Sequence, residues 1–85
     1  MKEFTYTIKD ALGIHVRPAG ALVKEMQKYE SEITIEKNGK KVGGRRLMAL
    51  MGLGVKCGET ITVTAEGPDE DAAIAGVEEF LKTNL

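Results

Sequence analysis

Apolar and polar residues alternate in three segments of the chain, and this period of two is typical of half-buried β-strands. The segments cover residues 2–8, 32–37 and 60–65. Asn38-Gly39 follows the second segment and predicts a tight hairpin, because both central residues of a type I′ turn need positive φ. The short polar segment 40–42 is then expected to form the return strand.

Three other segments have the period of an α-helix, near residues 16–28, 46–53 and 69–82. In the first of them, apolar residues fall at i, i+3, i+4 and i+7 and so share one face. These residues are Ala19, Leu22, Val23 and Met26. Pro18 fits only in the first turn of a helix, where its missing N–H costs little. The helix is therefore predicted to begin near residues 15–17.

The middle helical segment is apolar on nearly every side. A helix this short on a small domain cannot bury all of its Leu and Met side chains together. We therefore expect at least two of Leu47, Met48 and Met51 to be exposed to solvent. Exposed Leu and Met side chains that cluster in this way favour a surface for a protein partner.

The predicted order of elements is β-α-β-β-α-β-α, in a chain of 85 residues that has the size of one domain, residues 1–85. Three or four strands with all helices on one face make an α+β fold, a two-layer sandwich. Periodicity alone does not fix the order of the strands. Because a domain of this size buries only a modest core, we expect its chemistry to lie on the surface and to be completed by a partner.

The net charge of −1 indicates neither a nucleic-acid nor a membrane partner, but the charges are unevenly placed. Residues 1–56 hold eleven Lys or Arg and six Asp or Glu, whereas residues 57–85 hold one Lys and seven Asp or Glu. A basic cluster consists of Lys37, Lys40, Lys41, Arg45 and Arg46. This cluster is interpreted either as the solvated surface of a hairpin or as a surface that attracts acidic partner proteins. Nucleic-acid binding is favoured less, because no aromatic residues interleave with the basic ones.

The single cysteine and the single histidine exclude an internal disulfide and a zinc site. We expect no metal and no cofactor. No apolar run is long enough to span a bilayer or to act as a signal peptide, so we expect a cytoplasmic protein without membrane insertion. In that compartment Cys57 stays reduced, and it is assigned no role.

The candidate for chemistry is His15, at the predicted start of the first helix in Gly13-Ile14-His15-Val16-Arg17-Pro18-Ala19. Backbone N–H groups are unpaired at a helix N-terminus, and the helix dipole is positive there, so the position suits an anion such as phosphate. Arg17 adds a planar donor for phosphate oxygens. Positive surroundings also favour the neutral, nucleophilic form of the imidazole. A capping or surface histidine without function is the alternative interpretation.

This seven-residue segment resembles the active-site signature of HPr, the phosphocarrier family of the bacterial sugar phosphotransferase system. The segment Arg46-Leu47-Met48-Ala49-Leu50-Met51-Gly52-Leu53-Gly54 resembles the second signature of that family. The resemblance extends over the whole chain and includes Asn38-Gly39 and the Glu66-Gly67 turn. It implies an open-faced sandwich with a four-stranded antiparallel sheet in the order 1-4-2-3 and three helices on one face.

The resemblance also implies roles for individual residues. His15 would take a phosphoryl group on Nδ1 from phosphorylated Enzyme I and pass it to Enzyme IIA domains, so that the protein is a monomeric carrier with a phosphohistidine intermediate rather than an autonomous enzyme. The family's phosphate contacts would fall on Val16, Arg17 and Ala19. The family's partner-docking positions would fall on Gly20, Lys24, Leu47, Met48 and Met51.

One departure from the family concerns Arg46. Many Gram-positive members have a regulatory serine at this position, so the presence of Arg46 leaves this chain without that serine. A regulatory paralogue in the family lacks the histidine, which is present here. The alternatives to a carrier are therefore a regulatory or binding paralogue that acts outside sugar transport, and a small nucleic-acid binder.

Overall fold

The computed structural model describes residues 1–85, and its elements follow the predicted order. The strands are β1 (Lys2–Thr7), β2 (Glu32–Lys37), β3 (Lys40–Gly43) and β4 (Thr60–Glu66). The helices are α1 (Val16–Met26), α2 (Leu47–Gly52) and α3 (Glu70–Asn84). Every element that the sequence predicted is present, with small shifts at the ends, of which the earlier end of α1 at Met26 is one example.

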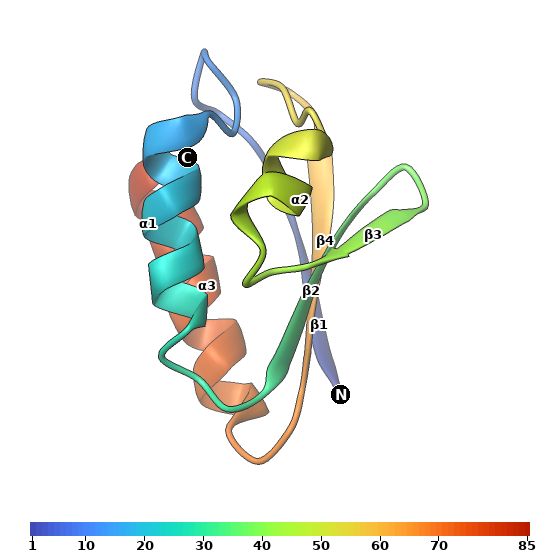
Figure 1. Cartoon of the computed structure of the whole chain (residues 1–85), viewed down its shortest axis with the longest axis vertical. Helices are drawn as coiled ribbons and strands as arrows, with labels where there is room; N and C mark the ends of the chain where they lie inside the picture. The colour runs from blue at the N-terminus through green and yellow to red at the C-terminus, as the bar shows by residue number, and fades with distance from the viewer.

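The four strands form one antiparallel sheet in the order β1-β4-β2-β3. All three helices lie on the same face of this sheet, and the other face is open (Figure 1). The α+β open-faced sandwich and the strand order that the resemblance implied are therefore confirmed. The hairpin is also as predicted, since Asn38 and Gly39 have φ values of 52° and 83°.

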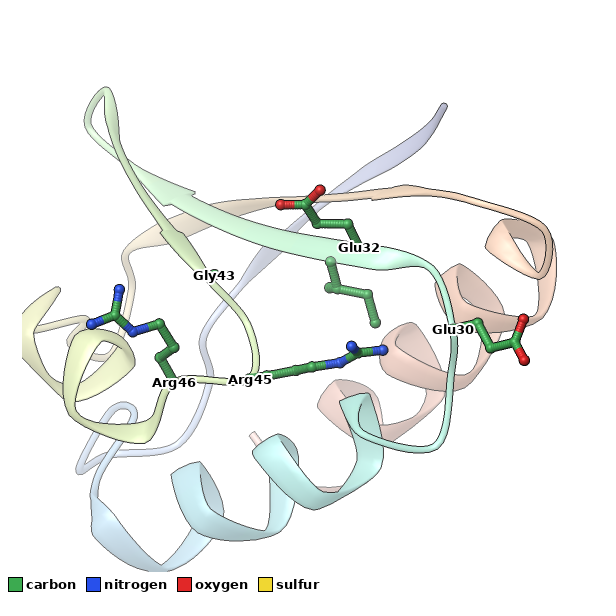
Figure 2. A pocket seen from close by; sticks show the side chains of 6 residues that line it. Glu30, Glu32, Gly43, Arg45 and Arg46 are labelled. Atoms are coloured by element: carbon green, nitrogen blue, oxygen red, sulfur yellow. The ribbon is translucent and has the colours of Figure 1, made fainter.

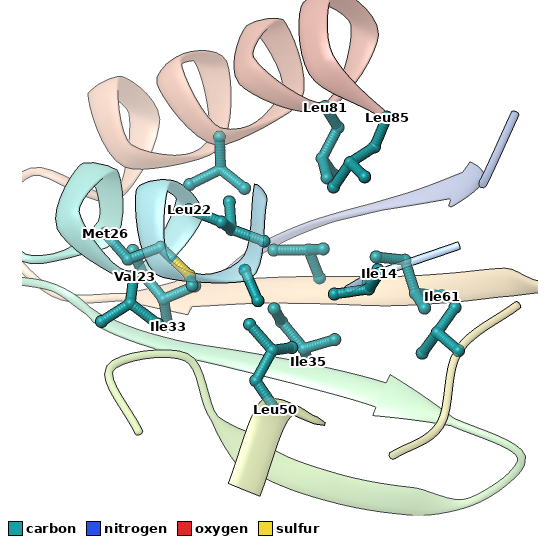
Figure 3. Packing of buried hydrophobic residues seen from close by; sticks show 14 of the residues in the cluster. Ile14, Leu22, Val23, Met26, Ile33, Ile35, Leu50, Ile61, Leu81 and Leu85 are labelled. Atoms are coloured by element: carbon teal, nitrogen blue, oxygen red, sulfur yellow. The ribbon is translucent and has the colours of Figure 1, made fainter. Parts of the chain in front are cut away.

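The core lies between the helices and the inner face of the sheet (Figure 3). The strands contribute the inward residues of each alternation, among them Ile33, Ile35 and Ile61, which are almost fully buried. All four apolar residues that were predicted to line one face of α1 are buried as well. The register of the pattern thus fixes which face of the sheet the helices cover.

The α1–β2 connection is fastened to the β4–α3 connection through the carboxylate of Asp69. This carboxylate accepts a hydrogen bond from the Ser31 hydroxyl at 2.5 Å and from the backbone N–H groups of Glu30 and Ser31 at 2.9 Å each. These bonds favour the ionised form, so they hold the pKa of Asp69 below its usual range. Ser31 is itself buried, with 1% of its surface exposed.

We expect the stability that Asp69 contributes to depend on pH. A lowered pKa in the folded state means that the contribution is complete above the unfolded pKa, about 4, and is lost as the pH falls through the folded pKa. The Asp69→Asn variant should therefore unfold at lower urea concentration than the unchanged protein at pH 7, and this difference should shrink below about pH 4. Asp71→Asn, which removes the same charge from an exposed neighbour, should have the smaller effect at pH 7. A constant difference between pH 7 and pH 3 would contradict this assignment.

Candidate functional site

His15 occupies the N-cap position of α1 without acting as a cap through its side chain. Its backbone is extended, with φ −112° and ψ 178°, and its imidazole makes no capping hydrogen bond. The helix thus begins where Pro18 required it to begin. Because 35% of the His15 side chain is exposed, the ring is accessible to a partner protein.

The first turn of α1 presents backbone N–H groups on the same side as His15. Val16 and Arg17 lie ahead of the first hydrogen bond of the helix, so their amides remain available to an anion. That first bond runs from the Ala19 N–H to the His15 carbonyl oxygen at 2.9 Å. The Ala19 amide therefore already has a partner, and Val16 and Arg17 are the better placed of the three predicted phosphate contacts.

A shallow hollow of about 240 Å³ surrounds the imidazole. Its lining residues come from the loop before α1, the first turns of α1 and the end of α3. They are Asp10, His15, Arg17, Pro18, Ala21 and Asn84. The structure thus brings His15 and Arg17 together as predicted, and it adds Asp10 and Asn84. Asn84 could not be predicted from a local pattern, because it lies far from His15 along the chain.

The loop that carries His15 is held by one hydrogen bond within the loop and by hydrogen bonds to two other parts of the chain. The Gly13 N–H donates to the Asp10 carbonyl oxygen at 2.9 Å and closes a tight turn. The Ile14 N–H donates to the Val55 carbonyl oxygen at 3.0 Å, and the Asp10 N–H donates to the Leu85 carbonyl oxygen at 2.9 Å. The imidazole therefore projects from an ordered loop.

Gly13 makes this ordering possible in two ways. Its φ is 69°, which a residue with a side chain rarely adopts. A Cβ at this position would also lie 2.8 Å from the Cα of Lys56 and would press against the Val55 carbonyl oxygen. Gly13 is therefore needed for a close approach of two loops.

We expect Gly13→Ala to destabilise the protein by more than about 1–2 kcal/mol, the cost of a left-handed backbone for a residue with a side chain. Gly54→Ala is the matched control, because Gly54 has a similar φ of 62° and open space where its Cβ would lie. The difference in free energy of unfolding between the two variants, measured in urea, isolates the crowding at Gly13. Equal losses in the two variants would show that the close approach contributes nothing.

Three large apolar side chains on the loop before α1, on α1 and on α2 are exposed to solvent. Leu12 and Val16 flank His15 in the sequence and are 73% and 65% exposed, and Met48 on α2 is 81% exposed. Figure 1 shows that the loop, the start of α1 and α2 lie at the same end of the molecule. We call Leu12, Val16 and Met48 the apolar rim. The exposure of Leu12 had not been predicted from the sequence.

The expectation that at least two of Leu47, Met48 and Met51 are exposed is wrong, because Met48 is the one exposed side chain of the three. Leu47 and Met51 are half-buried and pack against the core. The physical reason is that α2 packs against the core through Leu50, which is buried. Leu47 and Met51 lie next to Leu50 on the helix and are partly covered by the same contact. Their outer edges remain accessible beside Met48.

The two other predicted docking residues lie on α1. Gly20 and Lys24 follow Val16 at intervals of four residues, so the three share one face of the helix. Lys24 is exposed, and a Cβ at Gly20 would meet no atom within 4 Å. Close packing within this chain therefore does not require a glycine at position 20.

The basic cluster expected from the sequence is divided in the structure. Lys37 is 15% exposed, and its ammonium donates to the carbonyl oxygen of Gly54 at 3.0 Å and pairs with Glu59 at 2.9 Å. Arg45 donates to the carbonyl oxygens of Tyr29 and Ser31. Two of the five cations thus hold loops together, which weakens the interpretation as a nucleic-acid surface.

A second hollow, of about 370 Å³, lies beside Arg45 and Arg46 (Figure 2) and shares no lining residue with the hollow at His15. Glu30 and Glu32 also line it, so acidic and basic groups are balanced there. It holds no nucleophilic side chain, and it is not the candidate site. Cys57 is exposed and makes only a weak contact, from its Sγ to the Lys9 carbonyl oxygen at 3.7 Å.

No group of three or more His, Cys, Asp or Glu side chains is placed to hold a metal ion. None of the helices is long and apolar enough to cross a membrane.

The family described as "PTS HPr component phosphorylation site" matches residues 2–83 of the chain. Among solved structures, HPr of Thermoanaerobacter tengcongensis is 40% identical over 98% of this chain and 93% of its own, with a TM-score of 0.94. The histidine-containing phosphocarrier protein of Mycoplasma is 36% identical over 96% of this chain and 93% of its own, with a TM-score of 0.93. Crh, the catabolite repression protein of Bacillus subtilis, is 31% identical over 94% and 92% of the two chains, with a TM-score of 0.79, and its crystal structure is a domain-swapped dimer.

Proposed function

The chain belongs to the HPr family of phosphocarriers of the phosphotransferase system, and from this premise we propose that His15 is the residue that carries the phosphoryl group. The observation that supports this most is the position of the imidazole. It is partly exposed at the N-terminus of α1, makes no capping bond, and shares its hollow with Arg17. A nucleophile and an anion site thus coincide.

The transfer needs few groups from this chain. Nδ1 of the neutral imidazole attacks phosphorus, the bond from phosphorus to the donor breaks, and the bonding electrons leave with the donor. The phosphoryl oxygens then face the amides of Val16 and Arg17 and the Arg17 guanidinium. These groups lie on the surface, so a second partner can reach the phosphoryl group from the same side and remove it.

We propose that the donor is phosphorylated Enzyme I and that the acceptors are Enzyme IIA domains. The docking surface consists of the apolar rim together with Gly20, Lys24, Leu47 and Met51. It surrounds His15 on the α1 and α2 sides, so a partner bound there covers the imidazole and excludes water from the transfer. We expect the chain to act as a monomer.

Incubation with phosphoenolpyruvate and Enzyme I, followed by intact mass measurement, tests this proposal. We expect one phosphoryl group per chain, lost in acid and kept in alkali as an N–P bond should be. Addition of a IIA domain should return the mass to that of the unmodified chain. A mass that never changes in the presence of active Enzyme I would contradict the carrier function.

A regulatory function outside sugar transport is the second candidate, and the similarity to Crh is the observation in its favour. His15 favours the carrier, because a purely regulatory binding module has no need of a nucleophile at this position. Arg46 offers no hydroxyl group, so regulation through a phosphorylated serine at this position is not open to this chain.

A further inference from the structure

An acidic side chain faces the nitrogen of His15 that does not receive the phosphoryl group. The carboxylate of Asp10 lies 4.0 Å from Nε2 of His15, measured at Oδ1. Both side chains are about one-third exposed, and both line the hollow around the imidazole. Asp10 thus places a negative charge beside the imidazole, opposite in sign to the charge of Arg17 in the same hollow.

The position of the Asp10 carboxylate is fixed by the loop. Its Oδ1 accepts the Leu12 N–H at 2.8 Å, which is the local turn that Asp favours. The Asp10 backbone is held at both ends, by its N–H to Leu85 and by its carbonyl oxygen to Gly13. A carboxylate restrained in this way stays beside Nε2, unlike a mobile surface acid.

We propose that Asp10 is a positioning residue that keeps a proton on Nε2 and so leaves the lone pair on Nδ1. A neutral imidazole holds its proton on one nitrogen or the other, and a carboxylate beside Nε2 favours the form with Nε2–H. At 4.0 Å the contact is electrostatic, and a small ring rotation or one water closes it to a hydrogen bond.

The same contact serves every step of the transfer proposed above, on which this inference rests. When Nδ1 forms its bond to phosphorus, the ring gains a positive charge and keeps the proton on Nε2, and the Asp10 carboxylate partly neutralises that charge. When the phosphoryl group leaves for an acceptor, the electrons of the N–P bond return to the ring. The neutral ring with Nε2–H is restored, and no proton has moved.

The other groups around the ring do not share this role. Arg17 is a cation, and Asn84 from α3 is uncharged. Lys9 precedes Asp10 in the loop, and its backbone N–H donates to the Leu85 carbonyl oxygen at 2.7 Å. Asp10 is thus the acidic side chain that lines the hollow.

The tautomer of His15 can be measured directly in the unphosphorylated chain from the ¹⁵N chemical shifts of the imidazole. Asp10→Asn is the informative variant, because the amide oxygen can still accept the Leu12 N–H while the charge is removed. At a pH high enough for the imidazole to be neutral, we expect the ratio of the Nε2–H form to the Nδ1–H form to be about three- to tenfold lower in Asp10→Asn than in the unchanged protein. Asp10→Glu should restore part of the ratio.

Asp71→Asn is the matched control, since it removes an equal charge at the start of α3, at the opposite end of the molecule from His15 (Figure 1). It should leave the tautomer ratio unchanged. An unchanged ratio in Asp10→Asn, or an equal change in both variants, would overturn the inference. If the ratio responds as expected but the unchanged protein accepts no phosphoryl group, the inference about Asp10 stands and the proposed function fails. Backbone amide spectra of each variant establish that it is folded.

Discussion

The His15→Ala variant is expected to accept no phosphoryl group from phosphoenolpyruvate and Enzyme I, whereas the unchanged chain accepts one. The reason is chemical, because His15 is the single histidine and the nucleophile that the helix N-terminus and Arg17 surround. An alanine at the N-cap position can adopt the same extended backbone conformation as His15. The His15 side chain makes no capping bond, so its loss should change stability by less than about 1 kcal/mol. Intact mass measurement and urea unfolding check the two expectations separately.

Arg17→Gln provides the comparison for that experiment. It keeps the nucleophile and removes the guanidinium, so we expect transfer to slow rather than to stop. Slow labelling of Arg17→Gln beside unlabelled His15→Ala would assign the covalent role to His15 and the electrostatic role to Arg17. Persistent acid-labile labelling of His15→Ala would place the phosphoryl group on another residue and contradict the proposal.

The elements and the inner face of the sheet were predictable because each rests on a local pattern. Alternation located Ile33 and Ile35 on the buried face, and Asn38-Gly39 located the hairpin. Pro18 located the start of α1 to within a residue. The strand order is not local, and it followed from the family resemblance rather than from periodicity.

The surroundings of His15 were only partly predictable. Arg17 is close in sequence, so its proximity followed from the helix. Asp10 lies in the loop before α1, and its carboxylate lies 4.0 Å from Nε2 because the turn folds back on itself. Asn84 arrives from the end of α3, and no local pattern reports such a contact.

The basic cluster shows a second limit of sequence reasoning. A row of Lys and Arg residues looks like a charged surface, yet Lys37 and Arg45 are used to satisfy backbone carbonyl oxygens at the ends of other elements. Helix ends and loops leave such carbonyls without partners, and long cationic side chains reach them. Which cations are used in this way depends on the tertiary structure.

Met48 is the residue of the docking surface for which we expect the largest effect on partner binding. Its side chain is 81% exposed on α2, and Leu47 and Met51 on either side anchor the helix to the core. Because α2 is held against the core, a partner that covers Met48 has to order its side chain but not its backbone. These are the properties of residues that contribute strongly to protein interfaces.

The Met48→Glu variant should bind phosphorylated Enzyme I about 10- to 100-fold more weakly, because a carboxylate would have to be desolvated in an apolar contact. The free energy of unfolding should change by no more than about 0.5 kcal/mol, since the side chain is exposed in the free chain. Thr5→Glu is the control, because it adds the same charge at an exposed position of β1. Thr5 lies on the open face of the sheet, which the helices do not cover. Binding measured by titration calorimetry, with transfer rates at rising Enzyme I concentration, separates weaker docking from slower chemistry. Equal affinities of Met48→Glu and Thr5→Glu would show that Met48 lies outside the interface.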